Sequence, residues 1–375
     1  MTKKIVLAGG GTAGHVNPLL STALELRSRG YDVVALGTSQ GLETTLVPAA
    51  GVELVTIERV PLPRKPSLQF FSLPGRMKRA IAQCRSALSG ADALVGFGGY
   101  VSTPAYLAAR KMSLPIIIHE QNARPGLANR VGARWASALG LTFPLTPLKA
   151  KHGVTVVTGL PLRPAIQALA AARTTEEGRE SARRAAASKL GVDPNMQTLL
   201  ITGGSLGALN VNRAMVKVAA ELPEGVQVVH LTGKGKDQEV RDAVKAAGVA
   251  DRWHVIDYLS TMEDALAVAD LVVCRSGAGT VAEMTALGLP CVYVPLPIGN
   301  GEQKLNAADH VAQGGALLVA DHDLTSDYVR GTIFPLLGSE KLSEMAIASR
   351  ALAHPDGAQQ LADLIESTLQ KKDQK

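Results

Sequence analysis

The stretch from residue 271 to 283 has the pattern of a site that binds an anion. Its first four residues form an apolar, β-branched run that predicts a buried parallel strand, a glycine turn follows at 276–279, and helical spacing begins after it. The first N–H groups of a helix lack partners and lie at the positive end of its dipole, so such a turn can hold a phosphate. Glu283 could then hydrogen-bond a ribose diol. A structural turn with a capping Ser276 and a solvated Glu283 explains this stretch equally well.

A second glycine turn follows the first predicted strand. Gly9, Gly11 and Gly14 have the spacing of the dinucleotide-binding fingerprint. The second predicted strand, 32–36, lacks at its end the acidic residue that would hold a nicotinamide ribose, so only the phosphate-binding half of the fingerprint is present. His15 follows the turn, and its intrinsic pKa near neutrality makes it a candidate general base. A capping or hydrogen-bonding histidine is the alternative.

Further polar and glycine-rich groups stand where other predicted strands end. Gly98 and Gly99 follow a predicted strand at 93–97, and the four polar residues 119–122 follow one at 115–118. Ligands of open α/β sheets bind outside the carboxyl ends of the strands. Four consecutive polar residues at such an end favour function over packing.

The pattern of strand, glycine turn and helix restarts in the second half of the chain. Residues 5–14 and 200–207 share an apolar strand, paired glycines, a hydroxyl residue and a further glycine, which predicts two similar α/β units in tandem. The glycine and prolines at 159–164 predict a hinge between them. Alanine and charged residues at 166–190 predict one long, exposed helix.

The composition limits the classes of function. The chain of 375 residues has a formal net charge of +6, but residues 1–160 hold 18 Lys and Arg against 7 Asp and Glu, and the remainder holds 21 against 26. The basic half is therefore expected to meet something anionic. No nucleic-acid module, secretory signal or spanning apolar run is visible. Three widely spaced cysteines fit reduced thiols and offer no zinc spacing.

The segment 61–80 interleaves apolar and basic side chains. An apolar surface rimmed by cations is attracted to an anionic membrane, so we expect this segment to contact lipid; inward packing of its apolar residues is the alternative. The expected membrane contacts are Leu68, Phe70, Phe71, Leu73, Arg76, Lys78 and Arg79.

The sequence resembles the MurG family of bacterial peptidoglycan glycosyltransferases, in glycosyltransferase family 28, over essentially its whole length. The family's marks occur in order: Gly-Gly-Thr-x-Gly-His at 10–15, Gly-Gly-Tyr-Val-Ser at 98–102, His-Glu-Gln-Asn at 119–122, Gly-x-Pro-x-Arg at 159–163, Gly-Gly-Ser-x-Gly-Ala at 203–208, Arg-Ser-Gly-Ala at 275–278 with Glu283, and Gln-x-x-Asn at 303–306. The resemblance implies the α/β GT-B fold, in which two Rossmann-like, doubly wound parallel-sheet domains face a cleft.

The resemblance also implies a division of labour. Residues 1–160 would form the acceptor- and membrane-contacting domain, 161–350 the donor domain, and a helix at about 352–372 would pack back on the first domain. The enzyme would move N-acetylglucosamine from UDP-N-acetylglucosamine to the C4 hydroxyl of the muramyl sugar of lipid I, with inversion, giving lipid II. It would need no cofactor and no metal. Its expected place is the cytoplasmic face of the cell membrane, as a peripheral protein on the anionic inner leaflet, with other cell-wall synthesis and division proteins as candidate partners.

Site residues follow from the same resemblance. His15 is the candidate base and Glu120 the second choice. The diphosphate would meet Ser205 and the 276–280 turn, the uracil the Leu259 backbone, the ribose Glu283, and the sugar hydroxyls Glu302 and Gln303. The full implied donor set is Thr12, Ala13, Gly14, Asn122, Arg163, Ser205, Leu259, Ala278, Gly279, Thr280, Val281, Ala282, Glu283, Glu302 and Gln303. The implied contacts to the acceptor pyrophosphate are Gly10, Gly11, Thr12, Gly14, Gly98, Gly99 and Tyr100.

The sequence departs from the family pattern at three positions. Ala13 replaces a glycine, Leu206 a frequent glutamine that contacts the nucleotide, and Glu302 the first of a frequent Gln-Gln pair. The alternatives are another UDP-sugar enzyme of this architecture, such as a UDP-N-acetylglucosamine epimerase, a nicotinamide dehydrogenase, and a non-catalytic membrane-surface protein. The basic apolar segment favours a lipid acceptor over the epimerase.

Overall fold

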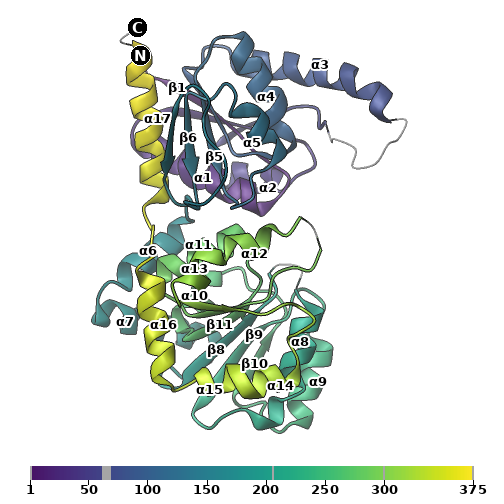
Figure 1. Cartoon of the computed structure of the whole chain (residues 1–375), viewed down its shortest axis with the longest axis vertical. Helices are drawn as coiled ribbons and strands as arrows, with labels where there is room; N and C mark the ends of the chain where they lie inside the picture. The colour runs from purple at the N-terminus through teal and green to yellow at the C-terminus, as the bar shows by residue number, and fades with distance from the viewer. Residues whose placement is uncertain (1, 61–68, 205–206, 299, 374–375) are drawn as a thin grey trace. The chain divides into compact units, whose positions relative to one another are not determined.

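The computed structural model describes residues 2–60, 69–204, 207–298 and 300–373, and the side chains of 69–72 and 372–373 are outside the description. The chain divides into two compact units. Unit 1 consists of Met1–Pro164 together with His354–Lys375, and unit 2 consists of Ala165–Ala353. Figure 1 shows both, coloured along the chain.

Unit 1 is built on a parallel sheet that, in the described residues, has seven strands in the order β3-β2-β1-β4-β5-β6-β7. Its strands are β1 (Lys4–Ala8), β2 (Asp32–Gly37), β3 (Glu53–Thr56), β4 (Ala93–Gly96), β5 (Ile116–Glu120), β6 (Ala138–Leu141) and β7 (Val154–Val157). Ile5 on β1 pairs with Val33 on one side and Ala93 on the other, so the strand order reverses between β1 and β4. Such a switch point opens a crevice for ligands at the carboxyl ends of these two strands.

Helices cover both faces of this sheet, which is why its central strands are continuous apolar runs. The helices of unit 1 are α1 (Ala13–Ser28), α2 (Glu43–Ala49), α3 (Gln69–Ala87), α4 (Gly99–Lys111), α5 (Leu127–Gly132) and α17 (Gly357–Asp373). One buried cluster joins β1, β2 and β4 to α1 and α17, and the other joins the opposite face to α3 and α4.

The C-terminal helix α17 belongs to unit 1. Leu361 and Ile365 are fully buried in the cluster with α1, and Figure 1 shows the helix along this unit. Arg29, at the end of α1, donates to Asp363 at 2.6 Å and to Glu366 at 3.0 Å. Apolar burial and these ion pairs together attach the last helix to the first sheet.

Unit 2 repeats the architecture with a parallel sheet of six strands among its described residues, in the order β10-β9-β8-β11-β12-β13. Its strands are β8 (Gln197–Thr202), β9 (Val226–Leu231), β10 (Trp253–Ile256), β11 (Leu271–Cys274), β12 (Cys291–Tyr293) and β13 (Ala316–Leu318). The predicted pair of Rossmann-like parallel-sheet domains is therefore confirmed.

Most helical elements of unit 2 are short, and α7 (Glu176–Leu190), with 15 residues, is longer. The helical elements are α6 (Pro164–Ala172), α7, α8 (Leu209–Val216), the 3-10 turn η1 (Ala219–Glu221), α9 (Gln238–Ala246), α10 (Met262–Val268), α11 (Ala278–Leu287), α12 (Glu302–Asn306), α13 (Ala308–Ala312), α14 (Ser326–Tyr328), the π-helical turn η2 (Val329–Ile333), α15 (Phe334–Leu336) and α16 (Glu340–Arg350). Within the described ranges no helix is both long and apolar enough to cross a membrane.

The prediction of one long, exposed helix at 166–190 is wrong. The segment forms two helices, α6 and α7, and Ile166 and Leu169 of α6 are buried. Thr175 has an extended backbone and its hydroxyl accepts the Gly178 N–H at 3.1 Å, which caps a new helix. Two acidic residues, Glu176 and Glu177, then open α7, where they favour the helix dipole.

Candidate active site

Predicted site residues lie at the carboxyl ends of the strands in both units. In unit 1 the turns after β1 and β4 carry the glycines and His15, and the polar run 119–122 spans the end of β5, which extends to Glu120 and not only to the predicted residue 118. In unit 2 the segments after β10, β11 and β12 carry Leu259, the 276–280 turn and α12. Since all these strands are parallel, each unit gathers its residues at one edge of its sheet.

The glycine turns after β1 and β4 of unit 1 touch. Gly98 and Gly99 have positive φ angles of 88° and 79°, which suit glycine alone. A Cβ on Gly99 would lie 2.8 Å from the Gly10 carbonyl oxygen, so any side chain there would push the turns apart. Tyr100 follows, with the Arg59 guanidinium 5.0 Å from its ring centroid. The structure thus brings together Gly10, Gly11, Thr12, Gly14, Gly98, Gly99 and Tyr100.

A buried carboxylate that the sequence analysis missed holds the first of these turns. Glu43, at the start of α2, is only 1% exposed. It accepts the Gly11 N–H at 2.9 Å with Oε2, and the Thr38 N–H and hydroxyl, each at 2.9 Å, with Oε1. Burial alone would raise the pKa of Glu43, but these hydrogen bonds outweigh it and hold the pKa below its usual value. The Gly11 N–H is therefore already occupied by a protein group.

Glu43 also explains the small residues around it. A Cβ on Gly10 would meet Glu43 Oε1 at 2.5 Å, and one on Gly37 would meet its Cγ at 2.6 Å. The carboxylate fills the space that these glycines leave. Nothing in the sequence pairs residue 43 with a turn 32 positions earlier, so pattern reasoning had no signal for it.

His15 lies in the first turn of α1, beside the Gly98 turn. Its Nδ1 is 3.0 Å from Thr12 Oγ1, and a Cβ on Gly98 would lie 3.3 Å from its Nε2. Burial lowers the pKa of His15 below 6.5, although the Glu43 carboxylate acts to raise it. The ring is therefore neutral at pH 7. In the tautomer that donates its Nδ1 proton to the Thr12 hydroxyl, Nε2 carries the lone pair that a general base needs.

Glu120 is buried in a network. Its Oε1 accepts the Asn122 N–H at 3.0 Å, and its Oε2 accepts the Gly126 N–H at 3.0 Å and the Asn129 amide at 2.9 Å. Burial raises the pKa of Glu120, and these hydrogen bonds oppose that rise. Asn129 also accepts the Tyr106 hydroxyl at 2.7 Å and would lie 3.5 Å from a Cβ on Gly98. The network thus reaches the same turn as His15, through Asn129, which the sequence analysis did not single out.

His119 has a structural role. Its Nε2 donates to the Gly159 carbonyl at 2.9 Å, and its Nδ1 accepts the Gln121 amide at 3.2 Å. Complete burial lowers the pKa of His119 to about 4. This neutral histidine ties the end of β5 to the start of the predicted hinge at 159–164, which contains the half-buried Arg163.

The turn between β11 and α11 in unit 2 presents an open helix N-terminus. Gly277 precedes the helix and supplies no side-chain cap, and the first turn of α11 holds no acidic residue. Ser276 is fully buried, yet among the residues that the structure describes its hydroxyl has no hydrogen-bond partner. A Cβ on Gly279 would meet nothing within 4 Å. Unlike the turn in unit 1, this one leaves a hydroxyl and helix N–H groups for a ligand.

Neighbouring residues fix this turn in place. Asn306, at the end of α12, is buried and donates to the Ser276 carbonyl at 3.3 Å. Arg275 donates to the Val294 carbonyl at 3.0 Å and pairs with Asp321 at 2.5 Å. The turn is thereby held by β12 and by the segment after β13.

The predicted donor residues of unit 2 that the structure describes lie at this same edge of its sheet. Thr280, Val281, Ala282 and Glu283 continue α11, Ala278 and Gly279 begin it, and Glu302 begins α12. The Gln303 side chain was expected to contact the sugar hydroxyls. Its oxygen instead accepts the Leu296 N–H at 2.9 Å. Leu259 is half-buried after β10. Ser205 and Leu206 lie outside the described residues.

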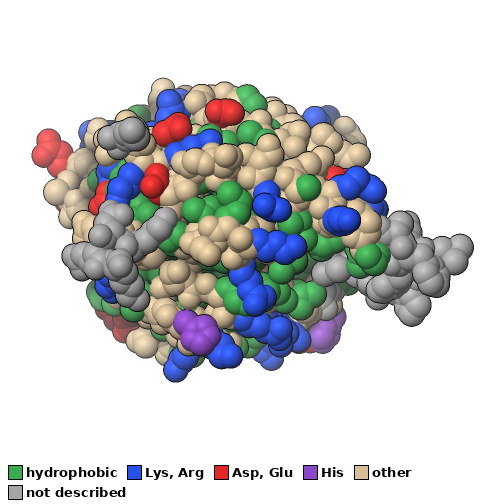
Figure 2. Space-filling model, turned by 90° about the horizontal axis from the view of Figure 1, so that it is seen from above, with side chains coloured by type: hydrophobic (Ala, Val, Ile, Leu, Met, Phe, Trp, Pro, Cys, Tyr) green, Lys and Arg blue, Asp and Glu red, His purple; other side chains and the backbone are tan. Residues whose placement is uncertain are grey.

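The predicted membrane segment is described in part. Leu68 lies outside the described residues, and so do the side chains of Phe70 and Phe71 in α3. Leu73 is half-buried and Lys78 is exposed. Figure 2 shows Lys and Arg side chains gathered in a band with hydrophobic ones between them.

Two of the predicted membrane cations have a protein partner. Arg76 and Arg79 both pair with Glu58, at 3.0 and 2.9 Å. These ion pairs hold the pKa of Glu58 below its usual value, and the bond to Arg79 has the larger effect. Lipid phosphates would have to compete with Glu58 for these two guanidinium groups, a contact that the sequence did not reveal.

Two family models match this chain, one over most of the first sheet's residues and one over those of the second. Residues 5–140 match the model of the glycosyltransferase family 28 N-terminal domain, and residues 198–361 match that of the C-terminal domain. A protein of Bifidobacterium adolescentis named UDP-N-acetylglucosamine--N-acetylmuramyl-(pentapeptide) pyrophosphoryl-undecaprenol N-acetylglucosamine transferase is 50% identical, with 96% of each chain covered. Its counterpart in Paenarthrobacter aurescens is 47% identical over 96% of this chain and 95% of its own.

Solved structures agree. The crystal structure of Acinetobacter baumannii MurG matches with a TM-score of 0.78 and 27% identity, over 97% of this chain and 99% of that one. A UDP-GlcNAc 2-epimerase from Neisseria meningitidis matches with a TM-score of 0.66 and 16% identity, over 98% and 100%. The second likeness concerns the fold alone.

Proposed function

The chain belongs to glycosyltransferase family 28, and on that premise we propose how its residues carry out the family's reaction. It is a UDP-N-acetylglucosamine-dependent transferase that adds N-acetylglucosamine to the muramyl-pentapeptide sugar of a pyrophosphoryl-undecaprenol lipid. This substrate is lipid I and the product lipid II, a precursor of peptidoglycan.

Unit 2 binds the donor. The observation that carries this assignment is the buried, unpartnered Ser276 hydroxyl beside the open N-terminus of α11. The hydroxyl and the first N–H groups of α11 hold the diphosphate, and Glu283, in the second turn, meets the ribose. Because the Gln303 oxygen is engaged with Leu296, its amide nitrogen is the atom that reaches a sugar hydroxyl. Ser205, Leu259 and Glu302 complete the donor contacts.

Unit 1 binds the acceptor and activates it. The adjoining turns at Gly10–Gly14 and Gly98–Tyr100 hold the acceptor pyrophosphate, with the Gly11 N–H excluded because Glu43 occupies it. His15 Nε2 takes the proton from the attacking C4 hydroxyl. Glu120 keeps the loop at 122–129 in place and is the second choice of base. Thr12, Ala13, Gly14, Asn122 and Arg163 contact the donor from this unit.

The departing UDP carries the developing negative charge of the reaction. The dipole and N–H groups of α11 stabilise that charge, so we propose that the reaction proceeds without a metal ion or other cofactor. Attack from the face opposite the leaving group converts the α-linked donor sugar into a β-linked product. The acceptor hydroxyl therefore attacks the face of the donor sugar opposite the diphosphate.

We place the protein at the cytoplasmic face of the cell membrane, as a peripheral protein on anionic lipid. The support is the band of cations between hydrophobic side chains and the exposed Lys78 on α3. Replacing Phe70, Phe71 and Leu73 with Ser should weaken binding to anionic liposomes while UDP binding stays unchanged. Unchanged liposome binding would show that this segment does not contact the membrane. Other proteins of cell-wall synthesis and division are candidate partners at that surface.

The proposal is tested by transfer of labelled sugar from UDP-N-acetylglucosamine to a soluble lipid I analogue, with and without a chelator. We expect β-linked product at the same rate in both conditions. Loss of transfer on chelation would overturn the metal-free assignment. Saturable donor binding without transfer would overturn the acceptor assignment and keep the donor site.

A further inference from the structure

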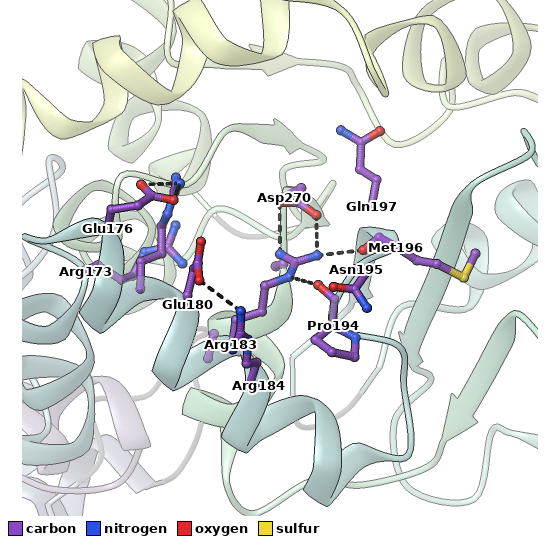
Figure 3. Close-up of a pocket in the computed structure, with 13 residues that line it drawn as sticks. Arg173, Glu176, Glu180, Arg183, Arg184, Pro194, Asn195, Met196, Gln197 and Asp270 are labelled. Atoms are coloured by element: carbon purple, nitrogen blue, oxygen red, sulfur yellow. Dashed lines mark hydrogen bonds and ion pairs between the residues drawn. The ribbon is translucent and has the colours of Figure 1, made fainter.

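A cavity of about 420 Å³ lies in unit 2 at the amino ends of β8 and β11, the sheet edge opposite the α11 turn. Figure 3 shows its charged walls, which come from the start of α7 and from the segments before β8 and β11. An adjoining cavity of about 260 Å³ shares Arg173 and Arg179 and extends to Gly288 and Arg350. The combined space has the size of a site for a small molecule.

Three of the five arginines around this space are paired. Arg183 makes two bonds of 3.0 Å to Asp270 and also donates to the carbonyls of Pro194 and Met196, which Figure 3 shows. The other pairs are Arg179 with Glu176 at 2.6 Å and Arg184 with Glu180 at 3.1 Å. These pairs use all three carboxylates that line the cavities.

Arg173 and Arg350 remain without a carboxylate partner among the described residues. Arg173 is half-buried, and the acceptor it has is the Leu287 carbonyl at 2.9 Å from its Nε. Burial, followed by the charges of Arg179 and Arg350, lowers the pKa of Arg173 to about 10, although the Asp270 carboxylate acts to raise it. The side-chain stem of Arg350 packs on Gly288, where a Cβ would lie 2.2 Å from its Cγ. Arg173 Nε and the side-chain stem of Arg350 thus both lie at the C-terminal end of α11.

A partly buried cation near other guanidinium groups is costly, and an anion between Arg173 and Arg350 would reduce that cost. Guanidinium forks bind phosphate and carboxylate oxygens in pairs, which gives such a site both affinity and direction. We infer that this pocket binds a small soluble anion with at least two negative charges, of the phosphate or polycarboxylate class, between Arg173 and Arg350.

The test is a calorimetric titration of the full chain with inorganic pyrophosphate in the presence of saturating UDP, which occupies the proposed donor site. We expect the dissociation constant to rise at least tenfold in Arg173→Gln and in Arg350→Gln. Arg241→Gln, which removes the same charge from an exposed site on α9 outside both cavities, should bind like the parent chain. Pyrophosphate bound at the turns of unit 1 would be unaffected by all three substitutions.

Equal affinity in the parent chain and in Arg350→Gln would overturn the inference, as would equal weakening in Arg241→Gln. Arg350 is exposed, so this variant tests the pocket even if Arg173→Gln fails to fold. A lipid phosphate is the other source of the same chemistry. Binding of Arg350→Gln to anionic liposomes should match that of the parent chain, and a loss there would overturn the assignment to a soluble anion.

Discussion

The turn after β1 in unit 1 and the turn after β11 in unit 2 share one design of strand, glycine turn and helix, yet they are filled differently. In unit 1 the Gly11 N–H donates to the buried Glu43 carboxylate, and His15 lies in the first turn of α1, which follows. In unit 2 the Ser276 hydroxyl is buried without a partner among the described residues.

The difference indicates two uses of the same element. A carboxylate beneath the turn of unit 1 fixes the backbone and raises the pKa of His15 against the effect of burial, which suits a turn that positions a base. An open helix N-terminus with a spare hydroxyl suits a turn that receives an anion. The two turns therefore share the order of strand, glycine turn and helix but differ in their backbone angles and in their neighbours.

The largest effect is expected from His15→Ala. Loss of a general base lowers kcat by roughly 10² to 10⁴-fold, while the dissociation constant of UDP-N-acetylglucosamine should hardly change. In the parent chain, kcat should fall as the pH falls through the His15 pKa, which lies below 6.5. Full activity in His15→Ala would show that another group takes the proton and would direct the same test to Glu120.

Glu43→Gln should have the next largest effect. It replaces a charge-assisted bond to the Gly11 N–H with a neutral one, and such bonds differ by about 1–2 kcal/mol, so kcat/KM for the acceptor analogue should fall by roughly five- to thirtyfold. Glu53→Gln, an exposed carboxylate on β3, is the matched control. If the acceptor kinetics of Glu43→Gln equal those of the control, the carboxylate does not position the turn.

Much of this account was available from the sequence because its signals are local. A strand, a glycine turn and a helix occupy about 15 consecutive residues, so the turns at 9–14, 98–99 and 276–279 were predicted, and the parallel fold with them. The features that the sequence did not predict were a break within a helical segment and contacts between residues far apart in the chain. The Thr175 cap divided a segment with uniform helical composition.

Contacts across long sequence separations had no sequence signal. Glu43 meets Gly11 across 32 positions, and Glu58 meets Arg76 across 18. An acidic residue at the start of a helix is usually solvated, so nothing marked Glu43 as buried. Asn306 illustrates the intermediate case, because its motif was noted but its bond to the Ser276 carbonyl appears only in the fold.

The smallest effect concerns acid stability of the cores beneath the turns. Burial lowers the pKa of His310 in unit 2 to about 4, with Tyr293 and Ser349 as its partners. Because the unfolded chain binds this proton near pH 6.5, the stabilising contribution is complete above 6.5 and is lost as the pH falls toward 4. The free energy of unfolding should therefore depend on pH less steeply in His310→Gln.

Denaturant unfolding between pH 7 and 4.5 measures this dependence. His322→Gln, whose side chain is 83% exposed, is the control and should keep the slope of the parent chain. If the free energy of unfolding depends on pH as steeply in His310→Gln as in the control, the pKa of His310 does not differ between the folded and unfolded chain.

The most direct test of the contrast between the two turns is a calorimetric titration with UDP of the parent chain, Ser276→Ala, Glu43→Gln and Ser181→Ala, the last an exposed serine on α7. Loss of one hydrogen bond to a charged group costs about 1.5 kcal/mol or more, so the dissociation constant should rise roughly tenfold in Ser276→Ala. The dissociation constant should stay within about twofold of the parent value in Glu43→Gln and Ser181→Ala, because these substitutions leave the hydrogen bond from Ser276 intact. Unchanged UDP affinity in Ser276→Ala, or an equal loss in Glu43→Gln, would contradict the assignment of the donor diphosphate to the turn of unit 2.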